Sequence, residues 1–220
     1  KHFVQSQGVV HKTDKQDAIM LARYGLNRGE QPLWTPESAE LRTLKAMMRR
    51  LAALEKDHQR EQNRLEAAAI SDTSDRVQQS LRDMIAVLQA EIRALEQDID
   101  DHIDGNPEMK KARGLLRSIS GIGPVLSREM VYLLLSHSFQ HAKQVANYVG
   151  VIPVLKESGS QKGQTRMSKA GPSRLRAKLY MAAVVAKKHN PDIRAQYERL
   201  TAAGKTRMQA IGAAIRKLVH

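Results

Sequence analysis

Two apolar stripes at heptad spacing constrain the fold of this chain more than any other feature of its sequence. In the first stripe the spacings are 3, 4 and 3 residues, and its members are Leu41, Leu44, Met48 and Leu51. After the polar break SDTSD, the second stripe alternates spacings of 4 and 3 through Leu81, Ile85, Leu88, Ile92, Leu95 and Ile99. This spacing on charged segments predicts two long helices of a coiled-coil arm. The helices can form an antiparallel hairpin within one chain, the seam of a homo-oligomer (dimer or tetramer), or both.

The composition favours a mainly α fold around these helices. Hydrophobic residues make up 41% of the 220 residues but aromatic residues only 4%, so the core must consist mostly of aliphatic side chains and Met. Helical patterns and their start and stop signals predict six further helices. They cover residues 108–118, 124–135, 142–149, 173–189, 192–203 and 206–219. A short pair of strands around "VIPVLKES" is the one candidate for β-structure.

These patterns divide the chain into three predicted domains. Residues 1–35 hold a short helix-forming segment, 36–105 the coiled-coil arm, and 106–220 a compact helical domain with many glycines. The helix of the first part is predicted to begin at Thr13, because Gln16 follows three residues later as in a capping box.

The positive charge of the chain is concentrated in its last third. The net charge is +13, and residues 156–220 contain 15 Lys and Arg but only 3 acidic residues. Such a distribution indicates a polyanionic partner, nucleic acid first, although ribosomal and other basic proteins have similar compositions. The chain has no Cys, which excludes thiolate zinc sites and fits a reducing compartment. No apolar run has the roughly 20 residues that a membrane helix needs, so we expect a cytoplasmic, nucleoid-associated protein without a membrane partner.

The segment "LLRSISGIGPVLSREMVYLL" resembles a helix-hairpin-helix. In that motif, glycines such as Gly121 and Gly123 let backbone N–H groups approach a DNA phosphate at a helix N-terminus. The alternative is an ordinary turn between two helices, with Ile122 buried between them.

Asp14 and Asp17 stand three residues apart at the start of the first predicted helix. This spacing places both carboxylates on one face, where they can share a divalent cation such as Mg²⁺. The alternative is that they only complement the helix dipole, as acidic residues in a first turn commonly do.

A loop rich in Ser, Gly and Gln combines hydroxyls with many cations. Its hydroxyls belong to Ser158, Ser160 and Thr165. The cations in and after it are Lys156, Lys162, Arg166, Lys169, Arg174 and Arg176. The residues alone predict a loop that grips phosphate, because a nucleophilic serine also needs an activating group. Two other signals are rejected: "AAGKT" (202–206) lacks the earlier glycine of a P-loop, and His137 and His141 lack a third metal ligand.

Three segments occur in one order: "KTDKQDA", "LLRSISGIGPVLS" and "ESGS…RMSKAGPSRLRAKLYMAA". Together they resemble the DEDD transposases of insertion elements, which include Piv-type invertases and bridge-RNA-guided serine recombinases. The resemblance covers essentially the whole chain, and the last segment is its most specific part.

The resemblance implies an RNase H-like domain with four acidic Mg²⁺ ligands, a coiled-coil arm, and a transposase domain with a serine nucleophile. Asp14 and Asp17 match the last two acids, and Ser158 matches the serine. DNA and a guide (bridge) RNA are the implied partners. The first Asp and the Glu of the acidic set would fall upstream of Lys1, so we expect residues 1–35 to be the C-terminal remnant of that domain. The implied function is a DNA transposase or recombinase, and the alternative is a silent fragment that binds nucleic acid and dimerises.

Overall fold

The computed structural model describes residues 13–28, 35–155 and 165–220. It separates into two compact units, residues 1–37 and 38–220. The first unit contains helix α2 (Asp14–Arg28). Thr13 caps this helix as predicted, because its Oγ1 accepts a hydrogen bond from the Gln16 amide at 3.2 Å.

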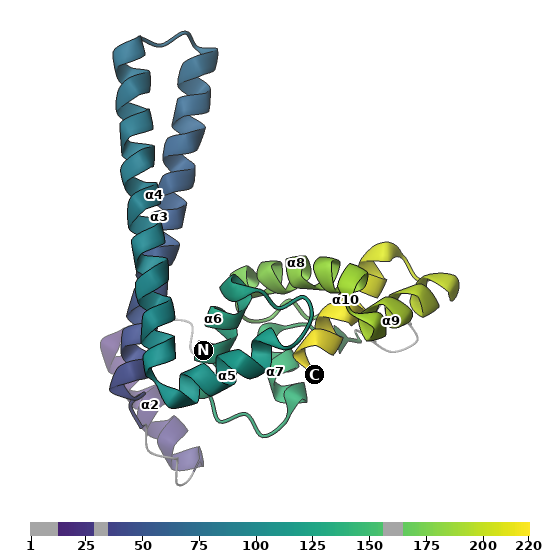
Figure 1. Cartoon of the computed structure of the whole chain (residues 1–220). Helices are drawn as coiled ribbons and strands as arrows, with labels where there is room; N and C mark the ends of the chain where they lie inside the picture. The colour runs from purple at the N-terminus through teal and green to yellow at the C-terminus, as the bar shows by residue number, and fades with distance from the viewer. Residues whose placement is uncertain (1–12, 29–34, 156–164) are drawn as a thin grey trace. The chain divides into compact units, whose positions relative to one another are not determined.

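The second unit begins with two long helices, α3 (Ala39–Ile70) and α4 (Asp75–Gly105), which run side by side in Figure 1. His102 at the end of α4 lies 2.9 Å from the carbonyl oxygen of Glu40 at the start of α3. Farther along, the side chains of Gln89 and His58 meet at 3.1 Å. The helices are therefore antiparallel, which confirms the predicted hairpin within one chain.

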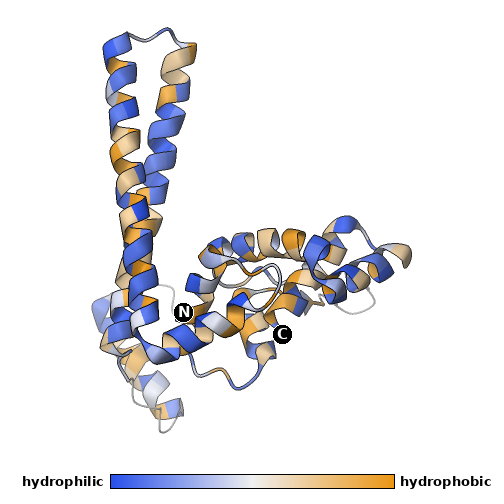
Figure 2. Ribbon diagram, viewed as in Figure 1, coloured by the Kyte–Doolittle hydropathy of each residue, from blue (hydrophilic) through white to orange (hydrophobic). Residues whose placement is uncertain are grey.

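The hairpin is most deeply buried near its base. Leu44, Ile99 and Ile103 are completely buried there, whereas Leu81 and Leu88 near the turn are only half-buried. Figure 2 shows hydrophilic residues over most of both helices. Packing against the rest of the unit therefore anchors the base, and the oligomeric role of the stripe stays a prediction.

Helices α5 (Pro107–Arg117) and α6 (Pro124–Ser136) follow the hairpin and pack against its base. Both begin with Pro, whose missing N–H costs nothing in a first helical turn. Asn106 caps α5, since its side chain accepts hydrogen bonds from the next two free amides, at 3.1 Å each.

A buried guanidinium joins α4 to α6. Arg128 donates to Asp100 from Nε at 2.9 Å and from Nη2 at 2.6 Å, and to Glu96 from Nη1 at 2.8 Å. Arg113 of α5 forms a second ion pair with Asp100 at 3.2 Å. The hydrogen bond from Arg128 lowers the pKa of Asp100, and the same bond raises the pKa of Arg128. These contacts fix the base of the hairpin to the helices that follow it.

The remaining elements are short. They are α7 (Ala142–Val149), β1 (Pro153–Val154), β2 (Arg166–Met167), α8 (Ser173–His189), α9 (Pro191–Ala202) and α10 (Arg207–Val219). All six helices predicted after the arm are present, each end within one residue of its predicted position. The predicted strands exist, but the prediction placed both around 151–158, whereas the second strand lies at 166–167.

Helix α8 lies at the centre of the C-terminal helices and packs against α6, α7, α9 and α10. Its buried face is made of Leu179 and of small residues such as Ala182, Ala183 and Ala186. Small side chains allow neighbouring segments to approach its backbone closely. Within the described part of the chain, no helix has the length and apolar character needed to cross a membrane.

The turn between α5 and α6 uses this close approach. Gly121 has φ +109°, and a Cβ there would lie 2.7 Å from the Cβ of Ala186 and 2.9 Å from the carbonyl oxygen of Ala182. Gly123 has φ −87°, and no atom lies within 4 Å of a Cβ placed on it. Gly121 is therefore required by packing on α8, whereas Gly123 faces open space.

We expect Gly121→Ala to lower the free energy of unfolding by about 2 kcal/mol, through backbone strain and overpacking. Gly123→Ala is the matched control and should change it by less than about 0.5 kcal/mol. Urea denaturation of the two variants measures both values. Equal stabilities would contradict the assigned packing of the turn.

Candidate nucleic-acid interface

The segment that contains Ser158, residues 156–164, is called the serine loop, and a two-stranded ladder holds the chain at both of its ends. β1 and β2 are antiparallel, with Pro153 opposite Met167 and Val154 opposite Arg166. Ser158, Ser160, Lys156 and Lys162 lie between these strands, in the segment 156–164, outside the described residues. The ladder therefore fixes where this segment leaves and re-enters the domain.

Two glycines lock the base of the loop to the end of α7. Gly150 has φ +76°, and a Cβ there would lie 1.9 Å from the carbonyl oxygen of Ala170. Gly171 has φ +77°, and its Cβ would lie 1.9 Å from the carbonyl oxygen of Tyr148. No other residue fits either position, because both need a left-handed backbone and direct backbone contact. The glycine of the "SKAG" segment is thus explained by packing.

Arg176 of α8 ties the same segments together. Its Nη1 donates to the carbonyl oxygens of Val149 at 2.9 Å, Ala170 at 2.7 Å and Gly171 at 3.2 Å. The phosphate contact that the sequence predicts for this residue stays a prediction. The structure gives its guanidinium a positioning role at the base of the loop.

We expect Arg176→Gln to lower the free energy of unfolding by about 2 kcal/mol, because carbonyls bonded to a charged donor lose that partner. Arg174→Gln is the matched control, two residues earlier on α8. Arg174 is exposed and forms a surface ion pair with Glu55. Its loss should cost at most about 1 kcal/mol. Thermal unfolding of both variants makes the comparison, and a larger loss in Arg174→Gln would contradict these roles.

Two other predicted cations, Arg166 and Lys169, lie at the base of the loop. Arg166 lies on β2, and Lys169 follows it with an exposed side chain and φ +56°. Lys178, which was not singled out from the sequence, bonds Glu129 at 2.6 Å. The structure thus places Arg166 and Lys169 beside the ends of the serine loop and gives Arg174 and Arg176 contacts within the protein. The phosphate contacts expected of these four residues stay predictions.

The predicted turn "GIGP" leads into a helix with an open first turn. Gly123 is the N-cap of α6 and no side chain hydrogen-bonds to the first amides of this helix. Ile122 is buried, as the alternative of an ordinary turn also requires. The phosphate contact predicted for Gly121 and Gly123 stays a prediction, and only Gly123 has the open surroundings that it needs.

Asp14 and Asp17 both lie in the first turn of α2. Asp14 is exposed and Asp17 is half-buried. Among the described residues no group of three or more His, Asp or Glu side chains is arranged to hold a metal ion. His137 has a packing role, since its ring stacks on Phe139 with centroids 5.2 Å apart.

A basic hollow between α8, α9 and α10 was not predicted from the sequence. It has a volume of about 660 Å³ and is lined by Lys187, Tyr197, Thr201, Lys205, Thr206 and Arg207. Part of it is the turn "GKT", which the sequence offered only as a false P-loop. The residues that line the hollow come from three helices, so no short sequence motif predicts it.

The matched family model covers residues 113–198 and is described as "Transposase IS116/IS110/IS902 family". This range includes the α5–α6 turn, α7, the strands that hold the serine loop, α8 and most of α9.

Relatives with longer chains match a larger part of the sequence. The pilin gene-inverting proteins of Moraxella lacunata and Moraxella bovis are each 34% identical over 220 residues, which is 99% of this chain and 66% of theirs. An IS110 insertion-element protein of Streptomyces coelicolor is 29% identical over 143 residues, 63% of this chain and 34% of its own. The chain therefore spans just under two thirds of the length of its Moraxella relatives.

Proposed function

We propose that this chain is a DNA transposase or recombinase of an insertion element, because its residues 113–198 match the family model described as "Transposase IS116/IS110/IS902 family". The observation that carries this proposal is the position of the match, which spans the segments that hold both ends of the serine loop. The similarity to proteins named for gene inversion supports the same class of reaction.

The described residues around the loop suit a polyanionic substrate. Arg166 and Lys169 lie where the loop re-enters the domain. Away from the loop, beside the contact of Gly121 with Ala182 and Ala186 of α8, Gly123 leaves the first turn of α6 without a close neighbour. Cations steady the charge of a phosphodiester, and helix N-termini favour anions. The net charge of the last third of the chain strengthens the attraction for DNA.

In the proposed reaction Ser158 is the nucleophile. Its Oγ attacks a DNA phosphorus atom, forms a serine–phosphate ester and breaks the bond from phosphorus to one sugar oxygen. That sugar oxygen leaves as a hydroxyl and takes up the proton that the serine gives up. Attack by another DNA hydroxyl on the ester then rejoins the strands and returns the serine.

A Mg²⁺ site is part of the family resemblance and not of the described geometry. Asp14 and Asp17 supply two carboxylates, and no third ligand joins them among the described residues. Two carboxylates on one helical turn do not make up a catalytic Mg²⁺ site. Asp14 and Asp17 are therefore only candidate ligands.

Two further partners belong to the proposal: a second copy of this chain, bound through the hairpin, and a guide RNA. The half-buried stripe on the distal part of α4 leaves apolar surface for a second copy, so the proposal includes a homo-oligomer formed through the arm. A guide RNA would add a second polyanionic partner for the basic third of the chain. The resemblance is the support for that RNA.

The second candidate function is a nucleic-acid-binding, dimerising protein without catalysis. The incomplete acidic set among the described residues favours it. The two functions share DNA binding and differ in strand cleavage, so a covalent serine–DNA adduct separates them.

DNA binding by the whole chain is expected to depend steeply on salt. Neutralising phosphates releases counterions, so a protein with six or more phosphate contacts loses roughly 10³-fold in affinity between 50 and 200 mM salt. Fluorescence anisotropy with a labelled duplex measures the slope. A response that is nearly flat in salt would contradict the proposed DNA interface.

Matched pairs of variants locate the contacts. Replacing Arg166 and Lys169 by Gln should reduce the slope of log affinity against log salt concentration by about 2, because each phosphate contact contributes about 0.9. Replacing Lys56 and Arg60 of the arm by Gln removes the same charge and should leave the slope nearly unchanged. Equal effects of the two pairs would mean that overall charge, not the loop base, governs binding.

A further inference from the structure

The hollow between α8, α9 and α10 has no role in the function proposed so far. Its six lining residues include three cations and no carboxylate. None of Lys187, Lys205 and Arg207 has an ion-pair partner among the residues that the structure describes. Three like charges around one cavity repel one another, and an anion relieves that repulsion.

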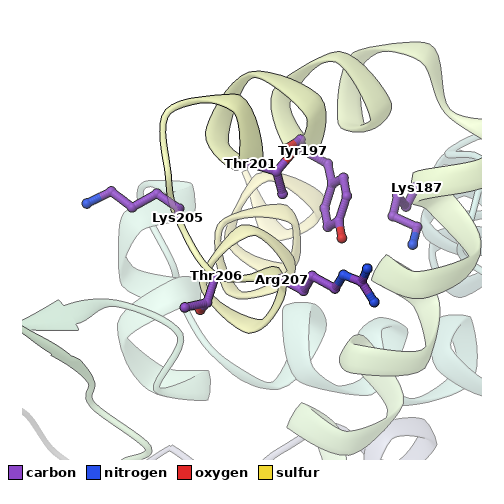
Figure 3. Close-up of a pocket in the computed structure, with 6 residues that line it drawn as sticks. All are labelled: Lys187, Tyr197, Thr201, Lys205, Thr206 and Arg207. Atoms are coloured by element: carbon purple, nitrogen blue, oxygen red, sulfur yellow. Dashed lines mark hydrogen bonds between the residues drawn. The ribbon is translucent and has the colours of Figure 1, made fainter.

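The side chains converge from different helices. Figure 3 shows the guanidinium of Arg207, the ammonium of Lys187 and the hydroxyl end of Tyr197 pointing into one space, with Lys205 extending from the turn to the other side. The Lys187 Nζ lies over the Tyr197 ring, 4.8 Å from its centroid. This cation–π contact holds the two side chains together at the wall of the hollow.

The backbone around the hollow is fixed. Gly204 has φ +78° and ends α9, and the Lys205 amide donates to the carbonyl oxygen of Leu200 at 3.0 Å. Thr206 caps α10, since its Oγ1 accepts from the Gln209 backbone amide at 3.3 Å, and the Gln209 Oε1 accepts from the Thr206 backbone amide at 2.9 Å. The cations at 205 and 207 are thus presented by a turn that backbone and capping hydrogen bonds hold in place.

Size and shape narrow the class of ligand. A volume of about 660 Å³ falls within the 300–1,000 Å³ typical of small-molecule sites, which is ample for one nucleotide. Duplex DNA presents its phosphates on ridges and keeps its bases stacked inside. Its bases therefore do not enter a hollow of this size on the protein. An unpaired nucleotide can enter a hollow and place its base or sugar against an aromatic ring.

We propose that the hollow between α8, α9 and α10 binds an unpaired nucleotide of a single nucleic-acid strand. Arg207 and Lys187 hold its phosphate, and the Tyr197 ring contacts its base or sugar. This inference rests on the proposed function, since it assigns a subsite to the strands on which the protein acts. DNA and RNA share this chemistry, and the experiment separates them.

The test uses the whole chain and labelled 12-nucleotide single strands of one mixed sequence, as DNA and as RNA, together with the matching DNA duplex. The pocket variant combines Lys187→Gln with Arg207→Gln. The control combines Lys188→Gln with Arg199→Gln, which removes the same charges from exposed neighbouring positions on α8 and α9. A ring pair, Tyr197→Leu and Tyr197→Phe, tests the aromatic contact, and thermal unfolding checks that each variant is folded.

We expect the pocket variant to weaken binding of at least one single strand by about tenfold. It should reduce the slope of log affinity against log salt concentration by about 0.7, because Lys187 and Arg207 hold one phosphate and single-strand slopes are about 0.7 per phosphate contact. The control variant should change the single-strand affinity and its salt slope by at most half as much as the pocket variant does. Tyr197→Leu should weaken single-strand binding by about tenfold, while Tyr197→Phe keeps the ring and stays within about threefold of the unchanged chain. Duplex affinity should not change in either ring variant.

The size of the effect on DNA against RNA identifies the strand that uses the site. Equal weakening by the pocket and control variants would overturn the proposal, because general charge would then explain binding. So would a folded Tyr197→Leu variant with unchanged single-strand affinity. A chain that binds neither single strands nor duplex would instead overturn the proposed function, so the two failures are distinguishable.

Discussion

Ser158→Ala is expected to abolish covalent capture of DNA, in protein expressed from its complete reading frame, while DNA affinity stays within about threefold. The hydroxyl of Ser158 supplies the nucleophile, whereas affinity comes from contacts of many cations with many phosphates. The measurement is a protein–DNA adduct that survives on a denaturing gel. Ser160→Ala is the control from the same loop and should keep most of the adduct.

The outcomes separate three mechanisms. An adduct that persists in Ser158→Ala and disappears in Ser160→Ala would assign the nucleophile to the other serine. Cleavage by the unchanged protein without any adduct would replace the serine ester by hydrolysis. Loss of DNA binding in Ser158→Ala would show that this residue acts in affinity, against the division of roles proposed here.

The helices of the C-terminal part could be predicted closely because their ends are encoded locally. Asn106 and Asn190 precede a Pro and cap the helices that follow, and Thr206 forms a capping box with Gln209. Such signals need only three or four neighbouring residues. The two helices of the arm could be predicted in the same way from the spacing of their apolar stripes, but this spacing left open whether they pair within one chain or in an oligomer.

The base of the serine loop could not be predicted, because its contacts join segments distant in sequence. The second strand lies beyond the loop, and Gly150 meets Ala170 twenty residues later. In the sequence Arg176 is one more cation in a basic stretch. Only the fold shows that it is bonded to backbone carbonyls, whereas the exposed Lys169 nearby is available to a ligand.

The difference between cations that position the backbone and cations that face solvent refines the sequence argument. Net charge predicts a polyanionic partner but cannot distinguish a guanidinium used inside the protein from one at its surface. Arg128, Arg113 and Arg176 belong to the first kind, and Arg207 to the second. The proposed nucleic-acid surface therefore uses fewer basic residues than their total number suggests.

The largest stability effect is expected at Arg128. Arg128→Met keeps an unbranched apolar stem and leaves the carboxylates of Asp100 and Glu96 without their main partner. Removing one member of a buried ion pair costs roughly 3–5 kcal/mol, and the partial exposure of both acids favours the lower end, about 3 kcal/mol. Urea denaturation measures the loss, and Arg60→Met, which breaks an exposed ion pair of α3 with Asp57, is the control with an expected cost of at most about 1 kcal/mol.

The double variant Arg128→Met with Asp100→Asn tests the cause. If the cost of Arg128→Met comes from the unpaired carboxylate, then neutralising Asp100 in the same chain should recover part of the lost stability. Strictly additive losses would instead assign the effect to packing of the Arg128 stem. A loss below about 1 kcal/mol in Arg128→Met would mean that water and Arg113 replace the guanidinium.

The pH dependence of stability gives an independent check. The folded pKa of Asp100 is lowered, mainly by the hydrogen bond from Arg128, so the folded chain binds this proton less readily than the unfolded chain. Its contribution is therefore fully present above the unfolded pKa, near 3.9 for Asp, and is lost as the pH falls through the lower folded pKa.

In Arg128→Met the difference between the folded and the unfolded pKa of Asp100 becomes smaller. The variant should therefore lose less additional stability than the unchanged chain when the pH falls from about 5 to below 4. Asp101→Asn, at an exposed neighbouring position of α4, should leave the original acid dependence intact. An acid dependence of Arg128→Met as steep as that of the unchanged chain would show that other carboxylates, and not Asp100, set the stability of the fold at low pH.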